Sequence, residues 1–286
     1  MDSSATKLST PSLLPKAWNP AKWPWWAIAL ILAGIGIILL IFTSQNYHDT
    51  FFYLTQGIYT TLRITFFSYI IATIIGLFAG LARVSKNVFL FNISTLYVET
   101  VRGVPLVVLL LYIAFAIFPV FVELVIGLGN WGLSFAPNNG VFLALSNFSI
   151  RNIPMEGRAI IALAIGYGAY EAEVFRAGIQ AIGKGQMEAA RSVGMNYVQA
   201  MRFIILPQAI RQVLPPLGND FIACLKDSSL ATVLAVNELT QMGRLRRAST
   251  FRVLETFNMV AFLYLSMTLL LSGLVRWLER KMKVTE

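Results

Sequence analysis

Six long apolar runs constrain this chain more than any other feature of its sequence. They lie at Trp25–Phe42, Ile58–Ala82, Ile93–Phe118, Ala159–Ile179, Leu217–Val236 and Phe257–Trp277. A helix of about 20 apolar residues crosses a bilayer, and its backbone polar groups are satisfied within the segment. Only 13% of the residues are charged, against roughly 25% in soluble domains. The sequence therefore predicts an all-α, polytopic membrane protein of one domain with about six transmembrane helices.

The net charge of +9 does not indicate a nucleic-acid partner. The basic residues are spread over the connecting segments, where they orient a membrane protein by the positive-inside rule. If the tail bearing Lys7, Lys16 and Lys22 is cytoplasmic, then Arg83, Lys86, the loop around Glu188 and the tail Arg276–Lys283 are cytoplasmic too. One segment disagrees with this orientation, because Arg244–Arg252, which carries four arginines, then falls in an external loop.

The first apolar run resembles a signal peptide in following a basic tail. Its length exceeds the usual 7–15 apolar residues, and no small-x-small cleavage site follows it. We therefore expect a retained helix.

No catalytic or metal-binding constellation is visible in the sequence. His48 is the only histidine and Cys224 the only cysteine, which excludes a histidine-based triad, a His-rich metal site and a disulfide. Residues 178–185 nearly match a nucleotide-binding GxxxxGK[ST] loop, but Gly185 replaces the required hydroxyl and no strand precedes the segment. We expect a chain that is not an enzyme and binds no cofactor.

A polar stretch of about thirty residues separates the fourth and fifth apolar runs. Met187–Met201 mixes small and apolar residues with charged ones, as in a short amphipathic helix, and Gly194 predicts a turn or kink within it. Such a helix either docks against a partner protein or lies on the membrane surface. The pattern alone leaves both readings open.

Several separate motifs resemble those of one family. They are Tyr97–Leu106 (YVETVRGVPL), Tyr170–Ile179 (YEAEVFRAGI), Gly185–Gly194 (GQMEAARSVG), Ile204–Ala209 (IILPQA) and Lys226–Leu230 (KDSSL). Together they resemble the polar-amino-acid branch of ABC importer permeases, whose cytoplasmic EAA loop binds an ATPase. The resemblance runs from about Gly57 to the C-terminal tail. The additional first span and the external segment 119–158 depart from it.

The resemblance implies a type I ABC importer permease in a bacterial inner membrane, with both termini cytoplasmic. It implies partners as well: ABC ATPase subunits that bind ATP and Mg²⁺, a second permease subunit that is identical or related, and a periplasmic amino-acid-binding protein. The residues that correspond to the ATPase-coupling loop are Glu188, Ala189, Ala190, Gly194 and Pro207. The alternative is an ion-coupled secondary amino acid transporter, whose inverted repeats we do not find in the sequence.

These expectations divide the chain into a cytoplasmic tail, 1–24, and a transmembrane domain, 25–286. The domain comprises the additional span 25–42, a core 57–280, the external segment 119–158, which is either a cap or a loose connector, and the coupling loop 182–215.

Charged residues inside the predicted spans are costly in lipid and should face protein or water. Glu99 with Arg102, and Glu173 with Arg176, have the i, i+3 spacing of ion pairs on one helix, and we expect structural roles for both pairs. Lys226, Asp227 and Ser228 lie near the middle of the predicted fifth span. We place them on the substrate pathway, since an amino acid carries both charge signs.

Overall fold

The computed structural model describes residues 25–282, and no strand occurs among them. In chain order the helices are α1 (Trp25–Thr43), α2 (Gln45–Arg83), α3 (Val88–Gly103), α4 (Leu106–Tyr112), η2 (Ile113–Ile117), α5 (Phe118–Phe135), α6 (Gly140–Ser146), η3 (Ile150–Asn152), α7 (Met155–Gln180), α8 (Lys184–Ser192), α9 (Tyr197–Ala200), η4 (Met201–Ile205), α10 (Leu206–Asp227), η5 (Ser228–Leu234), α11 (Leu239–Thr250) and α12 (Val253–Met282). The expected tail, residues 1–24, lies outside the described residues.

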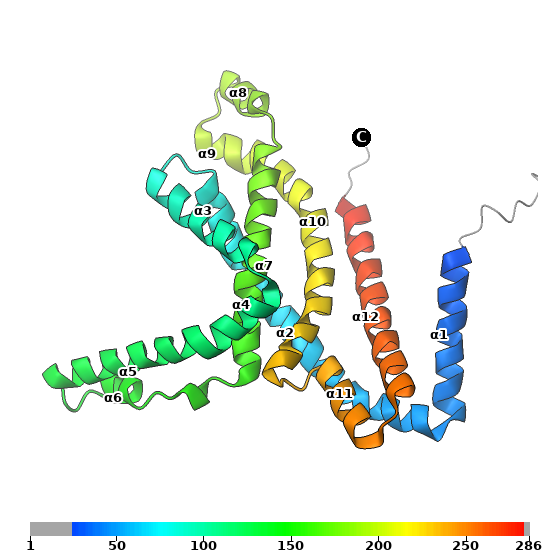
Figure 1. Ribbon diagram of the computed structural model, residues 1–286. Coiled ribbons are helices and arrows are strands. Elements are labelled where there is room, and N and C mark those ends of the chain that lie inside the picture. The colour runs from blue at the N-terminus through cyan, green and yellow to red at the C-terminus, as the bar shows by residue number, and fades with distance from the viewer. Residues whose placement is uncertain (1–24, 283–286) are drawn as a thin grey trace, which may run out of the picture.

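Helix α7 stands at the centre of the structure, with α2, α3, α4 and α10 packed around it (Figure 1). The turn from α2 to α3, the α8–α9 segment and the C-terminal end of α12 lie at the upper end of the view. The α1–α2 turn, α6 and α11 lie at the lower end. The segments that the charge pattern groups on the cytoplasmic side thus share one end of the structure.

Small residues allow α2 to pack closely against α7. Gly76 and Gly80 are both buried on this face. A Cβ atom at Gly76 would lie 2.7 Å from the Cβ of Glu171, and one at Gly80 would lie 2.8 Å from the carbonyl oxygen of Ala172. The small-xxx-small spacing in the predicted second span therefore marks a real helix contact.

Four described helical segments are long and apolar enough to cross a membrane: Trp25–Thr43, Gln45–Arg83, Leu106–Phe135 and Val253–Lys281. Helices α7 and α10, which the sequence also predicts to span, do not meet that criterion. Both carry several charged and small residues and pack against other helices.

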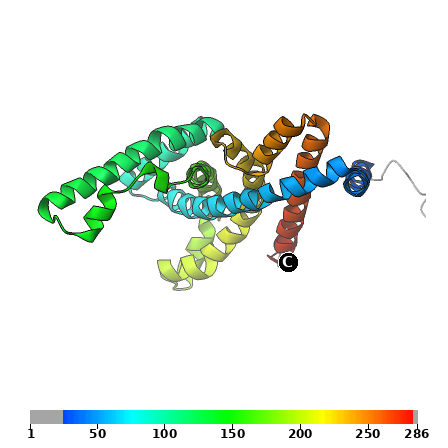
Figure 2. The same ribbon diagram turned by 90° about the horizontal axis from the view of Figure 1, so that it is seen from below.

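The expected third span, Ile93–Phe118, is wrong as one helix. The chain leaves helical geometry at Val104 and Pro105 and re-enters it at Leu106. Because proline disfavours helical geometry in the residue before it, the break falls where Pro105 follows Val104. The next helix, α4–η2–α5, continues to Phe135 and places much of the expected external connector in a long helix that leans away from α7 (Figure 2).

The expected coupling loop, 182–215, is also shorter in the structure. Helical geometry resumes at Tyr197 and continues through α9, η4 and α10 to Asp227, where the 3-10 helix η5 follows directly to Leu234. The helix that corresponds to the expected span Leu217–Val236 therefore begins earlier than expected. Pro215 and Pro216 lie inside α10 and do not mark its start. A widened π turn, η4, comes just before Pro207, as η2 does before Pro119. Wider turns accommodate residues that lack an N–H donor.

The arginine-rich segment expected to be an external loop is mostly the helix α11. Glu238 begins it, accepting hydrogen bonds from the backbone N–H groups of Thr240 and Gln241 at 2.8 Å each. The hydroxyl of Tyr264 on α12 donates to the same carboxylate at 2.8 Å. Burial raises the pKa of Glu238, and these hydrogen bonds oppose the rise. Arg246 stacks on Tyr53 of α2, so this part of the segment packs on the protein.

We predict that Gly80→Ala destabilises the protein by about 1–3 kcal/mol, the usual cost of overpacking. The new methyl group would lie against backbone of α7, which cannot move as a flexible side chain does. Gly273→Ala on α12 is the control, because nothing lies within 4 Å of a Cβ there. Thermal unfolding in detergent measures both variants, and equal midpoints would contradict the packing argument.

Candidate coupling and transport sites

The expected coupling residues lie on a short helical hairpin at one end of the structure. Helix α8 carries Glu188, Ala189 and Ala190, and it ends at Ser192. Gly194 has a φ of +86°, and two backbone hydrogen bonds surround it, from Gly194 N to Arg191 O at 2.9 Å and from Met195 N to Ala190 O at 3.1 Å. This pair of bonds is the Schellman arrangement that closes a helix. Gly194 is therefore the residue that ends α8.

A second turn begins the helix that leads back to the membrane core. The side chain of Asn196 accepts a hydrogen bond from Gln199 N at 2.9 Å, and the side chain of Gln199 accepts one from Asn196 N at 3.0 Å. Such reciprocal capping fixes the start of a helix. Gln208 of α10 donates to Gln186 of α8 at 3.4 Å, so the hairpin is tied to the helix that it enters.

The hairpin exposes both charged and apolar groups. Glu188 and Ala189 are exposed while Ala190 is buried, and the side chain of Glu188 makes no ion pair with another described residue. Val193, Val198 and Phe203 are 75%, 70% and 61% exposed. Exposed apolar side chains outside the membrane spans are typical of a surface that binds a partner protein or the membrane surface. Pro207 is also exposed, but it lies in the first turn of α10 and outside the hairpin.

A charge network joins α2, α3 and α7 below the hairpin. One oxygen of Glu173 accepts a hydrogen bond from Arg83 of α2, and the other accepts bonds from Arg176 Nε at 2.8 Å and Nη2 at 2.6 Å. The structure thus contains the Glu173–Arg176 ion pair that the i, i+3 spacing indicates. Arg83 also lies 3.2 Å from Glu99 of α3.

The expected pair of Glu99 with Arg102 does not form among the described residues. Glu99 pairs with Arg83 on another helix, and the guanidinium of Arg102 lies over the ring of Tyr170, 5.7 Å from its centroid. A nitrogen of Arg102 is 3.9 Å from Glu173. Local spacing permits an i, i+3 pair, but tertiary packing brings Arg83 closer. The sequence did not indicate Arg83 as a partner of Glu99, because Arg83 follows the predicted second span, Ile58–Ala82, and the charge pattern places it in the cytoplasmic turn.

The three residues assigned to the substrate pathway are not equivalent. Asp227, the last residue of α10, accepts a hydrogen bond from Tyr167 of α7 at 2.7 Å. Ser228 is fully buried and bonds to Leu225 O at 2.8 Å, so it offers nothing to a passing solute. Lys226 is exposed.

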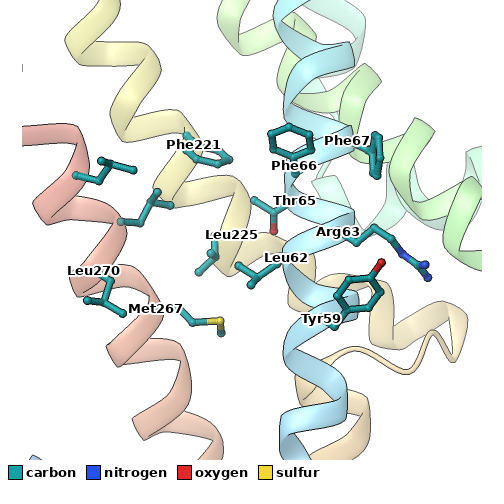
Figure 3. Close-up of a pocket in the computed structure, with 12 residues that line it drawn as sticks. Tyr59, Leu62, Arg63, Thr65, Phe66, Phe67, Phe221, Leu225, Met267 and Leu270 are labelled. Atoms are coloured by element: carbon teal, nitrogen blue, oxygen red, sulfur yellow. The ribbon is translucent and has the colours of Figure 1, made fainter. Parts of the chain in front are cut away.

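A cavity of about 670 Å³ opens between α2, α10 and α12 (Figure 3). Its lining is almost entirely apolar, with Leu62, Phe66, Phe221 and Leu270 among the side chains that face it. Arg63 lies at its edge and pairs with Glu156 of α7. A charged solute would lose its hydration there without compensation, so we do not assign this cavity to transport.

We predict that Gly194→Ala loosens the end of α8 at a cost of about 1–2 kcal/mol, because a side chain disfavours a positive φ. Open space surrounds the position, so the effect comes from the backbone conformation alone. Gly127→Ala on α5, which also meets nothing within 4 Å and lacks the positive φ, is the control. Amide hydrogen exchange of residues 185–195 should speed up in the first variant and stay unchanged in the second. Equal exchange in both would contradict the role given to Gly194.

The chain is similar to known transport proteins over most of its length. Residues 72–284 match the family described as "Binding-protein-dependent transport system inner membrane component". The glutamine transport system permease protein GlnP of Escherichia coli (strain K12) is 36% identical over 231 residues, which are 81% of this chain and 93% of the relative. The L-cystine transport system permease protein TcyB of Bacillus subtilis (strain 168) is 34% identical over 230 residues, 80% and 86% of the two chains.

Two solved structures are similar as well. A chain of the crystal structure of an amino acid ABC transporter with histidines is 36% identical, with a TM-score of 0.64 over 80% of this chain and 94% of that one. A chain of the inward-facing MetNI methionine ABC transporter has a TM-score of 0.61 at 20% identity over 82% and 97% of the two chains, which supports the fold alone. The chain therefore belongs to the family of binding-protein-dependent transport system inner membrane components, the multi-pass permease subunits of ABC importers.

Proposed function

We propose that this permease carries an amino acid into the cell, driven by ATPase subunits that dock on the α8–α9 hairpin. The observation that carries the proposal is the exposed surface of that hairpin, where Glu188 and Ala189 stand beside the exposed side chains of Val193 and Val198. ATP and Mg²⁺ would bind to the partner subunits. Family membership favours this function over ion-coupled secondary transport.

The hairpin is suited to transmitting movement from the ATPases to the membrane helices and from the membrane helices to the ATPases. Its first helix ends in a Schellman turn at Gly194, and its second element continues without a break through α10 to Asp227. A displacement of the hairpin by the ATPases would therefore move α10, which packs on α7 and α12. Coupling of this kind requires that the partner contact the hairpin differently in two transport states.

The cargo class rests on the relatives, which are named as permeases for glutamine and L-cystine. We propose that this chain also carries an amino acid, that a periplasmic binding protein delivers the amino acid to it, and that it pairs with a second permease subunit. The orientation, with both termini cytoplasmic, rests on the charge pattern and on the shared end of α8, α9 and the last turn of α12.

The first experiment reconstitutes the chain with its ATPase, its binding protein and any sister permease in liposomes. We expect ATP-dependent uptake of at least one member of a panel of labelled L-amino acids and no uptake when ATP is omitted. Uptake driven by a proton or sodium gradient without the ATPase would contradict the proposal. Absence of uptake for every amino acid on the panel would contradict the cargo class.

A second experiment tests the coupling surface. Reversing the charge of an exposed side chain should not harm the fold, so we expect Glu188→Arg to reach the membrane in normal amounts. Because the docked surface would carry the wrong charge, uptake should fall at least about tenfold, as for a lost charged contact at an interface. Glu279→Arg near the C-terminal end of α12 is the control and should retain uptake. Wild-type uptake by Glu188→Arg would rule out the coupling role of Glu188.

A further inference from the structure

Helices α5 and α6 pack on each other and form an arm that leads away from the helices around α7. This α5–α6 arm, residues 118–146, lies outside the motifs that resemble the family. It extends sideways at the end of the structure opposite the α8–α9 hairpin (Figure 1). Figure 2 shows α5 along its length while α7 is seen nearly end-on. Since α7 joins the two ends of the structure that the membrane separates, α5 runs roughly along the plane of the membrane.

The arm is a packed unit with a defined shape. Gly129 and Gly132 are buried on the side of α5 that meets α6. A Cβ atom at Gly129 would overlap the backbone of Ser146, and one at Gly132 would overlap the ring of Phe142. The side chain of Asn139 begins α6 by accepting a hydrogen bond from Val141 N at 2.9 Å. The arm is therefore a built element and not a loose connector.

A buried arginine fixes the arm at its root. Arg158 lies near the start of α7, and its guanidinium donates to the carbonyl oxygens of Ala114, Ile150 and Ile153 at 3.3, 2.9 and 3.1 Å. Ala114 belongs to η2, which precedes α5, and Ile150 follows α6. Both connections of the arm are thus tied to one side chain of α7, which sets the direction in which the arm extends.

The part of α5 that α6 leaves uncovered has an apolar side and a polar side. Large apolar residues are exposed at spacings of three and four, which places them on one side of a helix of about 3.6 residues per turn: Phe121, Leu124, Leu128, Trp131 and Phe135. Exposed small and polar residues follow a neighbouring side at the same spacing: Glu123, Gly127, Asn130 and Ser134. A helix that is apolar on one side, polar on another and parallel to the membrane plane is typical of the membrane–water boundary.

The composition of the arm favours lipid over a protein as the partner of the apolar side. No charged residue lies between Glu123 and Arg151, whereas a surface that binds a soluble protein has a polar, solvent-accessible rim. Trp131 is 65% exposed, and tryptophan is enriched where a membrane meets water. The same helical run, Leu106–Phe135, is apolar enough to lie in a membrane throughout.

We infer that the α5–α6 arm lies in the membrane boundary opposite the α8–α9 hairpin and binds the lipid bilayer. The apolar side of α5 faces the acyl chains, and the side that carries Glu123 and Asn130 faces the headgroups and water. Because Arg158 ties the arm to the start of α7, the arm holds that end of the central helix at one depth in the membrane.

The test measures which phase each side of α5 contacts. The full chain is assembled with its partner subunits in liposomes, with Cys224→Ala as the background, and carries one spin-labelled cysteine at a time. Leu124→Cys and Leu128→Cys report on the apolar side, and Glu123→Cys and Asn130→Cys report on the polar side. All four positions are exposed, so the substitutions should leave the fold and ATP-dependent uptake unchanged. Electron paramagnetic resonance then compares collisions with oxygen, which concentrates in the bilayer, and with a nickel chelate, which stays in water.

Two further labels give the reference values. Leu32→Cys on α1, where the side chain is 62% exposed on an apolar helix, represents lipid. Lys86→Cys, in the exposed turn between α2 and α3, represents water. We expect labels on the apolar side to match the first reference in their ratio of oxygen to nickel collisions and labels on the polar side to approach the second.

Each other result would overturn the inference. Nickel access on both sides of α5 would mean that the arm stands in water, and oxygen access on both sides would mean that it is sunk in the bilayer. Immobile labels at Leu124→Cys and Leu128→Cys that neither reagent reaches would mean that a protein subunit covers the apolar side. None of these results bears on the proposed function, which the uptake experiment tests separately.

Discussion

Close packing of α2 against α7 is the contact on which the rest of the structure depends. Gly76 and Gly80 bring the two backbones together along their length, and α7 then presents Glu173 to Arg83 at the end of α2. The same helix holds Tyr167 against α10 and Tyr170 against Arg102 of α3. Because helices in a bilayer gain little from burying apolar surface, close approach and polar contacts decide how they associate. Here both act through one central helix.

The central position of α7 links the hairpin to the charged residues of α2 and α3. Glu173 binds arginines from two directions, with Arg83 on α2 and Arg176 one turn further along α7. Arg176 continues to Gln180, the last residue of α7 before the turn into α8, at 2.6 Å. A movement of the hairpin can therefore reach Glu173 through a short series of contacts. This physical continuity supports coupling only if the series has two arrangements in the transport cycle.

Sequence patterns predicted the helical membrane fold well and predicted its interruptions poorly. Apolar length located α1, α2 and α12 to within a few residues except at the start of α2, since length and composition decide whether a helix can cross lipid. The motif around Glu188 and the turn at Gly194 were predicted because glycine at a helix end has a specific backbone reason. The break at Val104–Pro105 was not predicted, because it lies within an apolar run whose hydropathy indicates one continuous helix. Likewise, local spacing favoured Glu99 with Arg102, and only the tertiary packing of α2 against α3 brings Arg83 to Glu99.

The missed break and the misassigned ion pair coincide in space, and this coincidence has a physical reason. A soluble or lipid-facing helix would gain from continuing through residues 103–105 and from neutralising Glu99 with its own neighbour. The chain does neither, because Pro105 interrupts the helix through its own backbone restriction and Arg83 of α2 supplies the partner of Glu99. Both departures therefore come from particular residues, a proline and an arginine on another helix, that hydropathy and i, i+3 spacing do not take into account.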